Sequence, residues 1–113
     1  MSDCLFCKII EGTIPSTKVY EDDKVYAFRD INPQAPVHVL VVPKKHYENV
    51  TECATNDPDL AGYVLKKCAE IAKSEGLVNG FRLITNNGDD ACQSVHHMHV
   101  HILGGTQLTD KMG

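Results

Sequence analysis

The chain of 113 residues lacks several features that would narrow its function. It has no run of basic residues, and its 15 acidic residues outnumber the 11 basic ones, which gives a net charge of −4. Such a balance does not favour binding to duplex nucleic acid or to an anionic membrane surface. No apolar stretch is long enough to span a bilayer, and the polar start of the chain does not resemble a signal peptide. We therefore expect a cytoplasmic or nuclear protein with neither a nucleic-acid nor a membrane partner.

The sequence also lacks internal repeats, low-complexity tracts and an inter-domain linker. Its length suffices for a hydrophobic core, so residues 1–113 are expected to form a single domain. The five cysteines are odd in number and occur in a chain without a secretion signal. We interpret them as thiols or metal ligands rather than as a disulfide framework.

Short strand patterns and one long helical pattern indicate an α+β fold with a mainly antiparallel sheet. Asp57 and Pro58 are suited to begin a helix, in which apolar residues recur at helical spacing until Gly76. The apolar run 37–42 is typical of a central strand buried on both faces. The other predicted elements are a short helix at 4–10 and strands at 19–21, 25–30, 81–85 and 97–103. Connections this short rarely hold the crossover helices that a parallel sheet needs.

Histidine, by contrast, is concentrated at every second position of one apolar run, as His97, His99 and His101. In a β-strand these side chains would share one face, about 7 Å apart, and Met98, Val100 and Ile102 would face a core. Imidazole is a nucleophile, a proton carrier near neutral pH and a metal ligand. The spacing therefore predicts a reactive or metal-binding face, with a chance polar strand face as the alternative.

The run QSVHHMHVHILGG at residues 93–105 resembles the signature of the histidine triad (HIT) family of nucleotide hydrolases and transferases. The segments 27–36 and 40–46 are similar to those that precede the helix in the Hint branch of this family, and Asn86 and Gly88 stand where that branch has Asn and Gly. The resemblance extends from about Cys4 to Gly105. It implies a HIT-like fold with about five antiparallel strands, one long helix and a short N-terminal helix.

The resemblance implies a role for each residue of the triad segment. His99 would be the nucleophile that attacks the α-phosphorus of a nucleotide and forms a nucleotidyl-histidine, which water then cleaves. His101 would donate to a phosphate oxygen and stabilise the charge of the transition state. Ser94 would help to pass a proton to a departing amine, and His97 is the first member of the triad. This chemistry needs no catalytic metal.

The nucleotide pocket follows from the same resemblance. Asp30 would accept both ribose hydroxyls, and Phe28 and Ile31 would flank the base. The phosphate side would be formed by Asn86, Cys92, Gln93, Ser94, His99 and His101. Relatives have a glycine where Cys92 stands, so the close approach of this loop to phosphate differs here. The implied substrate is a purine nucleotide, an AMP or GMP conjugate hydrolysed at the P–N bond of a nucleoside 5′-phosphoramidate.

Cys4-x-x-Cys7 offers half of the ligands of a tetrahedral zinc site. Some HIT relatives complete such a site with the histidine after Pro-Lys and with the first triad histidine, which are His46 and His97 here. The resemblance thus predicts a structural zinc held by Cys4, Cys7, His46 and His97. Several Hint members lack the cysteines, and without zinc His46 and His97 would be hydrogen-bonded beside the nucleophile.

Three other functions stay open. The chain could hydrolyse dinucleoside polyphosphates, although its Gly104-Gly105-x-Gln107 end favours the Hint branch. It could be a nucleotide-binding scaffold whose hydrolysis is incidental, or a metalloenzyme that holds one metal with its three triad histidines. Hint relatives are homodimers that pair the long helix and the adjoining strand, so a homodimer is expected. The tail at 106–113 has no tryptophan, whereas Hint proteins commonly end in an aromatic-containing tail.

Overall fold

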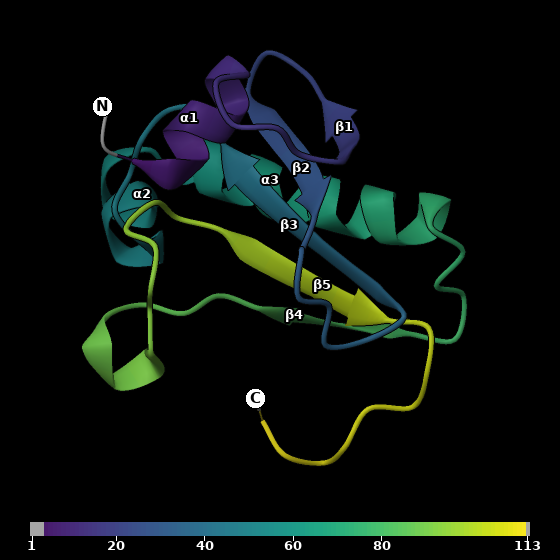
Figure 1. The fold of residues 1–113 in the computed structure, drawn as a ribbon. Coiled ribbons are helices and arrows are strands. Elements are labelled where there is room, and N and C mark those ends of the chain that lie inside the picture. Colours follow the sequence, from purple (N-terminus) through teal and green to yellow (C-terminus); the bar gives the residue numbers. More distant parts are fainter. Residues whose placement is uncertain (1–3, 113) are drawn as a thin grey trace.

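An open antiparallel sheet with the strand order β1-β2-β3-β5-β4 forms the framework of the computed structural model, which describes residues 4–112 (Figure 1). Its strands are β1 (Lys18–Glu21), β2 (Val25–Arg29), β3 (Val37–Pro43), β4 (Phe81–Ile84) and β5 (Val100–Gly104). The helices are α1 (Leu5–Glu11), α2 (Val50–Asn56), α3 (Pro58–Ser74) and the 3₁₀ turn η1 (Asp89–Ala91). All neighbouring strands are antiparallel, which confirms the predicted α+β class. The ends of the predicted domain, residues 1–3 and 113, lie outside the described residues.

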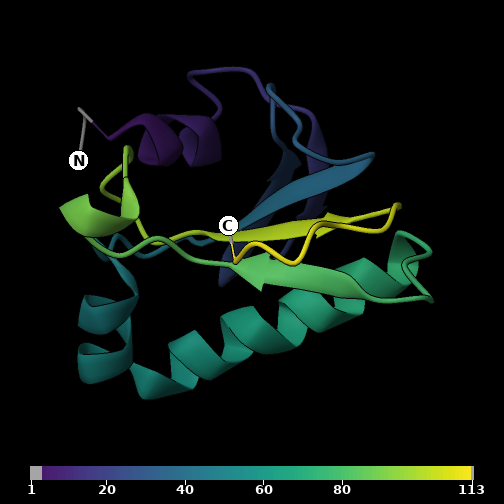
Figure 2. The same ribbon diagram turned by 90° about the horizontal axis from the view of Figure 1, so that it is seen from below.

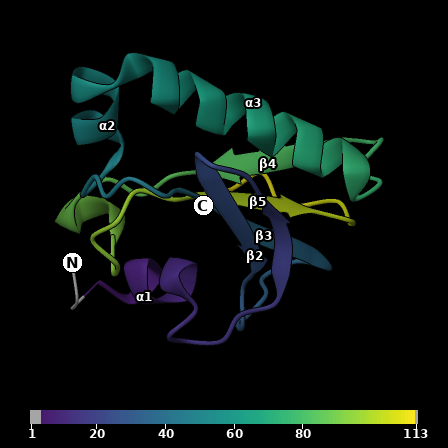
Figure 3. The same cartoon turned by 90° about the horizontal axis from the view of Figure 1, so that it is seen from above.

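The helices divide between the two faces of the sheet. Helices α2 and α3 cover one face, and α1 lies against the other (Figures 2 and 3). The larger core lies between α3 and the sheet, and a smaller core, which includes Phe6 and Ile9 of α1, lies on the opposite face. Both faces of the central strands are therefore buried.

Alternate side chains of strand β3 pack into the two different cores. Val39 and Val41 belong to the core under α3, whereas Leu40 and Val42 belong to the core under α1. This confirms the central strand predicted from the apolar run 37–42. His38 has the parity of Leu40, so its side chain lies on the α1 face, which is also the face of His101, because Leu40 pairs with His101.

Helix α3 begins where the sequence predicts. Asp57 accepts a hydrogen bond from the Leu60 amide at 3.2 Å, and Pro58 occupies the first turn, where no amide donor is missed. After the helix Gly76 adopts a φ of +78°, a left-handed conformation that favours glycine. Within residues 4–112 no helix is both long and apolar enough to cross a bilayer.

Two predictions about elements are wrong. Helix α2 was not predicted, and β5 begins at Val100, so that His97 and His99 precede the strand. The backbone of this segment bonds outside the sheet ladder: the Met98 amide donates to the Tyr47 carbonyl at 2.7 Å. The Thr85 hydroxyl donates to the His99 carbonyl, also at 2.7 Å. The predicted core face is nevertheless confirmed, because Met98, Val100 and Ile102 are all buried under α3.

Candidate active site

A cavity of about 260 Å³ opens between α1, the end of β2 and the histidine segment. Six predicted site residues line it: Phe28, Asp30, Ile31, Ser94, His99 and His101. Helix α1 supplies further apolar side chains, of which Phe6 packs edge-on against Phe28 with ring centroids 5.5 Å apart. Ile31 keeps 91% of its surface exposed, so an apolar wall is open to a ligand. The cavity is apolar where α1 meets β2 and polar where the histidines enter it.

His99 is held so that one ring nitrogen keeps its lone pair. Its Nδ1 lies 2.7 Å from the carbonyl oxygen of His97, and since a carbonyl can only accept, Nδ1 carries the proton. The Nε2 atom of a neutral ring is then unprotonated. Burial lowers the pKa of His99 below its ordinary value, so the ring is neutral at pH 7. A neutral imidazole with a free Nε2 is a nucleophile.

His101 is held by a second histidine, His38, which the apolar run around it predicts to be buried and hydrogen-bonded but does not connect with the site. The Gln34 amide donates to Nδ1 of His38 at 3.0 Å, so the proton of the neutral His38 ring sits on Nε2. That Nε2 lies 2.9 Å from Nδ1 of His101 and donates to it. His101 therefore carries its own proton on Nε2, as a donor. Burial and then the neighbouring His99 and His38 rings lower the pKa of His101 to about 4, which leaves it neutral at pH 7.

Asp30 has two different surroundings on its two oxygens. Oδ1 accepts from the Asn32 amide at 2.8 Å, which closes the turn after β2. Oδ2 lies 3.4 Å from Nε2 of His38, and Asp30 lines the cavity. The carboxylate thus both stabilises the turn and presents an acceptor at the edge of the cavity.

The other residues predicted for the phosphate side do not all line this cavity. Asn86 lines a second cavity of about 530 Å³ together with His38 and His101. Gln93 is buried and already has partners for its amide: it donates to the carbonyls of Glu48 and Val95 and accepts from the Gly88 amide.

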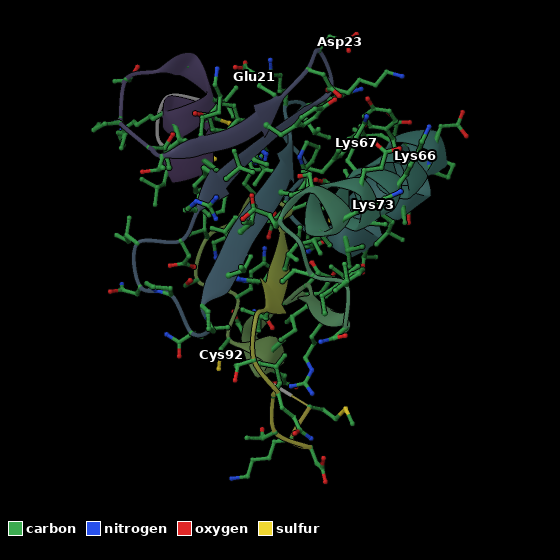
Figure 4. All side chains as sticks on the ribbon, turned by 90° about the vertical axis from the view of Figure 1, so that its right-hand side faces the viewer. Glu21, Asp23, Lys66, Lys67, Lys73 and Cys92 are labelled. Carbon is green, nitrogen blue, oxygen red and sulfur yellow. The ribbon has the colours of Figure 1, made fainter. Side chains whose placement is uncertain are left out.

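Ser94 is exposed on the cavity wall. Cys92 is exposed on the loop after η1 (Figure 4) and has a φ of 60°, a left-handed conformation that favours glycine. The loop thus places Ser94 at the cavity and holds its own shape through Gln93.

The four residues predicted to hold zinc are brought together. Nδ1 of His97 lies 3.3 Å from the Cys4 sulfur, 3.5 Å from the Cys7 sulfur and 3.2 Å from Nδ1 of His46. The Cys7 sulfur lies 3.4 Å from the same His46 nitrogen. Ligands of a tetrahedral zinc with usual bond lengths are separated by roughly 3.3–3.8 Å. The spacing therefore suits a zinc ion.

The protonation of this cluster also suits a cation. Nε2 of His97 lies 2.7 Å from the Pro43 carbonyl and must donate to it, which leaves the Nδ1 lone pair facing the two sulfurs. Burial first, and the adjoining Cys4 thiol next, raise the pKa of Cys7 to about 11. The Cys7 thiol therefore stays protonated at pH 7 by itself, whereas a bound dication would stabilise its thiolate.

The three triad rings do not gather around a common point, as a three-histidine metalloenzyme would require. His97 faces the cysteines, and His99 uses Nδ1 to bond a carbonyl. Among the described residues the other group of suitable ligand atoms is Asp30, His38 and His101. There Nε2 of His38 carries a proton, because its Nδ1 accepts from an amide, so this nitrogen offers no lone pair to a metal. This second group is instead organised by a chain of hydrogen bonds, from the Gln34 amide to His38 and from His38 to His101.

Residues 11–108 match the family model of the HIT domain. The chain is 50% identical over 110 residues to a maize protein named 14 kDa zinc-binding protein, with 95% of this chain and 85% of the relative covered. It is 48% identical over 109 residues to adenylylsulfatase HINT1 of Arabidopsis thaliana, with 95% and 74% covered. A solved HIT family hydrolase from Clostridium thermocellum superposes with a TM-score of 0.93 at 44% identity, covering 99% of this chain and 98% of that one.

The fold of the open antiparallel sheet is thus shared with this solved hydrolase over nearly the whole chain. The chain belongs to the histidine triad (HIT) family, as its Hint-like sequence segments predict.

Proposed function

We propose that the protein is a nucleotide hydrolase that cleaves the P–N bond of nucleoside 5′-phosphoramidates through a covalent nucleotidyl-His99. The hydrogen bond from Nδ1 of His99 to the His97 carbonyl carries this proposal, because it leaves Nε2 free to attack phosphorus. The names of relatives support hydrolysis, since one is called a HIT family hydrolase and another an adenylylsulfatase.

The reaction has two steps. In the first, Nε2 of His99 forms a bond to the α-phosphorus, the P–N bond breaks, and the leaving amine takes a proton that solvent supplies and the Ser94 hydroxyl relays. The positive charge of the substituted ring is stabilised by the His97 carbonyl that accepts from Nδ1. In the second step water forms a P–O bond and releases one proton to solvent. The N–P bond breaks with its electron pair returning to Nε2 of His99, and the nucleoside monophosphate leaves. His101 donates its Nε2 proton to a phosphate oxygen and stabilises charge in both transition states.

The cavity gives this reaction a binding mode for the nucleotide. The purine lies in its apolar part, against Phe28 and Ile31, and the ribose hydroxyls donate to Oδ2 of Asp30. The α-phosphate then lies at His99 and His101, and the leaving group points toward the second cavity beside Asn86. Apolar walls recognise shape more than polar groups, so both adenine and guanine fit this mode.

We further propose that Cys4, Cys7, His46 and His97 hold a structural zinc, which connects the N-terminal turn to the histidine segment. The ligand spacing and the free Nδ1 lone pair of His97 support this assignment, and so does the name of the maize relative. Four protein ligands close the coordination sphere, so such a zinc has no open position for substrate and is not catalytic.

Intact-mass spectrometry tests the covalent intermediate. On brief incubation with adenosine 5′-phosphoramidate, the wild-type protein should gain one adenylyl group on His99, and His99→Ala should gain none and hydrolyse nothing. The matched control is His96→Ala, because His96 is exposed and lies outside the cavity. Turnover in His99→Ala, or an adduct on another residue, would refute the nucleophile assignment.

The name of the Arabidopsis relative favours a second substrate, adenylyl sulfate. The same His99 would displace sulfate, which departs as a stable anion and needs no proton. Ser94→Ala should therefore slow phosphoramidate hydrolysis by about tenfold or more and leave adenylyl sulfate hydrolysis within a factor of about two. Equal losses of rate on both substrates would contradict the proton-transfer role of Ser94.

Rates on diadenosine triphosphate, measured in the same assay, distinguish a Hint-like phosphoramidase from a dinucleoside polyphosphate hydrolase.

A further inference from the structure

Helix α1 contributes to both the metal cluster and the nucleotide cavity. Cys4 and Cys7, at its N-terminal end, point their sulfurs at His46 and His97. Leu5, Phe6 and Ile9, from the same two turns, line the cavity that would hold the base. Any change in the position of α1 therefore changes both sites together.

Two direct connections run from the cluster to the nucleophile. The first is His97 itself, whose ring belongs to the cluster and whose carbonyl accepts the Nδ1 proton of His99 at 2.7 Å. The second is the ring of Phe6, which meets His99 edge-on with centroids 4.9 Å apart and His97 with centroids 6.1 Å apart. The cluster thus includes the residue, His97, whose carbonyl sets the orientation of the nucleophile.

Apart from the cluster, the tertiary contacts of α1 are those of the smaller core. It has seven residues, and helices shorter than about 12 residues are marginal in water without tertiary contacts. Among the described residues its buried side chains are Phe6 and Ile9, in the smaller core. Cys4 also caps the helix, since its sulfur accepts from the Cys7 amide at 3.3 Å. A ligand that binds the two thiols would therefore order the helix that forms one wall of the cavity.

We propose that metal binding at Cys4, Cys7, His46 and His97 and nucleotide binding at the His99 cavity are positively coupled through α1 and His97. The inference rests on the nucleotide site and the zinc site proposed above and adds that neither binds independently of the other. The ligand that binds first restricts α1 and the His97 carbonyl, so the second loses less conformational entropy. By linkage, each ligand must tighten the other by the same factor.

Titration calorimetry of AMP against zinc-loaded and zinc-stripped wild-type protein tests the coupling. The zinc-loaded protein should bind AMP about tenfold more tightly, within the usual range of coupling between sites. Zinc affinity, measured by competition with a chelator, should rise by the same factor in saturating AMP. Circular dichroism of the stripped protein establishes that it is folded. Equal AMP affinities with and without zinc, in two folded samples, would overturn the proposal.

Variants of α1 locate the coupling. Cys4→Ser/Cys7→Ser keeps an oxygen acceptor at the cap but removes both thiolates, so its AMP affinity should equal that of stripped wild type and should not respond to zinc. Phe6→Leu keeps all four ligands, so it should still bind one zinc, and its ratio of AMP affinities with and without zinc should fall toward one. Glu11→Gln, at the exposed end of α1, is the matched control and should keep the wild-type ratio.

These measurements separate the coupling from the proposed reaction, because AMP binding needs no turnover. An adduct on His99 together with zinc-independent AMP binding would refute the proposed coupling and leave the proposed reaction intact. Coupled binding without any adduct or hydrolysis would refute the proposed reaction and leave the coupling intact. An unchanged affinity ratio in Phe6→Leu would show that α1 does not transmit the effect through this ring and would overturn that part of the proposal.

Discussion

At the scale of single residues, backbone groups decide which nitrogen of each active-site ring carries a proton. The His97 carbonyl places the proton of His99 on Nδ1, and the Gln34 amide places that of His38 on Nε2. Burial then keeps these rings neutral, because it lowers the pKa of His99 and of His38 below the ordinary value. The acid–base properties of the site thus follow from the fold around it.

The pH dependence of turnover reports this neutral state. Protonation of Nε2 removes the nucleophile, and the lowered pKa of His99 moves that protonation to a lower pH than for a free imidazole. We therefore expect the acid limb of kcat/KM for a phosphoramidate to be centred below about 6.5, the ordinary value for histidine. Rates between pH 4.5 and 8, corrected for spontaneous hydrolysis, measure this. An acid limb centred above about 6.5 would show that His99 is not shielded from solvent.

His38 should act on the reaction through His101. Replacing it by Phe removes the donor to Nδ1 of His101, so the His101 proton is free to move to Nδ1 and leave Nε2 without a proton. A wrong tautomer of this kind should lower kcat by about 100-fold or more, with a smaller effect on KM. His38→Gln, whose amide both donates and accepts, should recover part of the loss. Equal kcat in His38→Phe and wild type would remove His38 from the mechanism.

The alternating histidines were enough to predict that residues 97–101 form part of the site. The contribution of His38 to the site could not be predicted from its sequence neighbours. It stands in an apolar run, where a buried histidine has no evident partner. Its contact with His101 depends on the register of β3 against β5, which pairs Leu40 with His101 and makes His38 a diagonal neighbour. Similarly, the amide of Gln93 is occupied by loop carbonyls that no local pattern reveals.

At the scale of elements, the apolar run of β3 and the cap and apolar period of α3 were strong enough to predict these elements from the sequence. Helix α2 and the start of β5 have weaker local patterns and were not predicted. Helix α2 contains the β-branched Val50, Thr51 and Thr55 and buries only Cys53, so its apolar period is faint. Its start was nevertheless encoded, because Asn49 accepts from the Glu52 amide at 2.9 Å, the spacing of a helix cap. The start of β5 depends on bonds to distant residues such as Tyr47, which a local pattern cannot supply.

The turn between β1 and β2 is attached to α3 by one carboxylate. Asp22 accepts from the amides of Lys24 and Val25, both at 2.8 Å, and from the hydroxyls of Tyr20 and Tyr63. Burial by itself would raise the pKa of Asp22, but these hydrogen bonds outweigh it and hold the pKa well below its ordinary value. The carboxylate therefore stabilises the fold above about pH 4, and this contribution is lost as the pH falls below that.

Asp22→Asn should lower the free energy of unfolding at pH 7 by about 2 kcal/mol, because charge-assisted hydrogen bonds are replaced by weaker ones. Urea denaturation at pH 7 and pH 3 measures the effect, which should shrink at the lower pH. The matched control is Asp23→Asn, since Asp23 is its exposed neighbour at the tip of the hairpin (Figure 4). Equal stabilities of the two variants would contradict the anchoring role of Asp22.

At the scale of the whole molecule, the two edges of the sheet differ. The β1 edge has an irregular register between Lys18 and Tyr20, and Glu21 forms ion pairs with Lys18 and Lys44. Bulges and charges of this kind discourage pairing with another strand. The β4 edge, residues 81–84, has no acidic residue and pairs only with β5 among the described strands. Helix α3 runs beside it, as Figure 2 shows.

We therefore propose that the homodimer expected from the sequence forms at the β4 edge, where an antiparallel second copy would continue the sheet. Phe81 of β4 is 41% exposed and Leu65 of α3 is 54% exposed, so apolar surface lies at this edge. Light scattering should give twice the chain mass of 12.5 kDa for the wild type. Phe81→Lys should shift the protein toward the monomer, because a charge would be buried where the two copies meet. Lys18→Ala, at the β1 edge, should remain dimeric; a monomeric wild type, or dissociation by Lys18→Ala instead, would place any contact elsewhere.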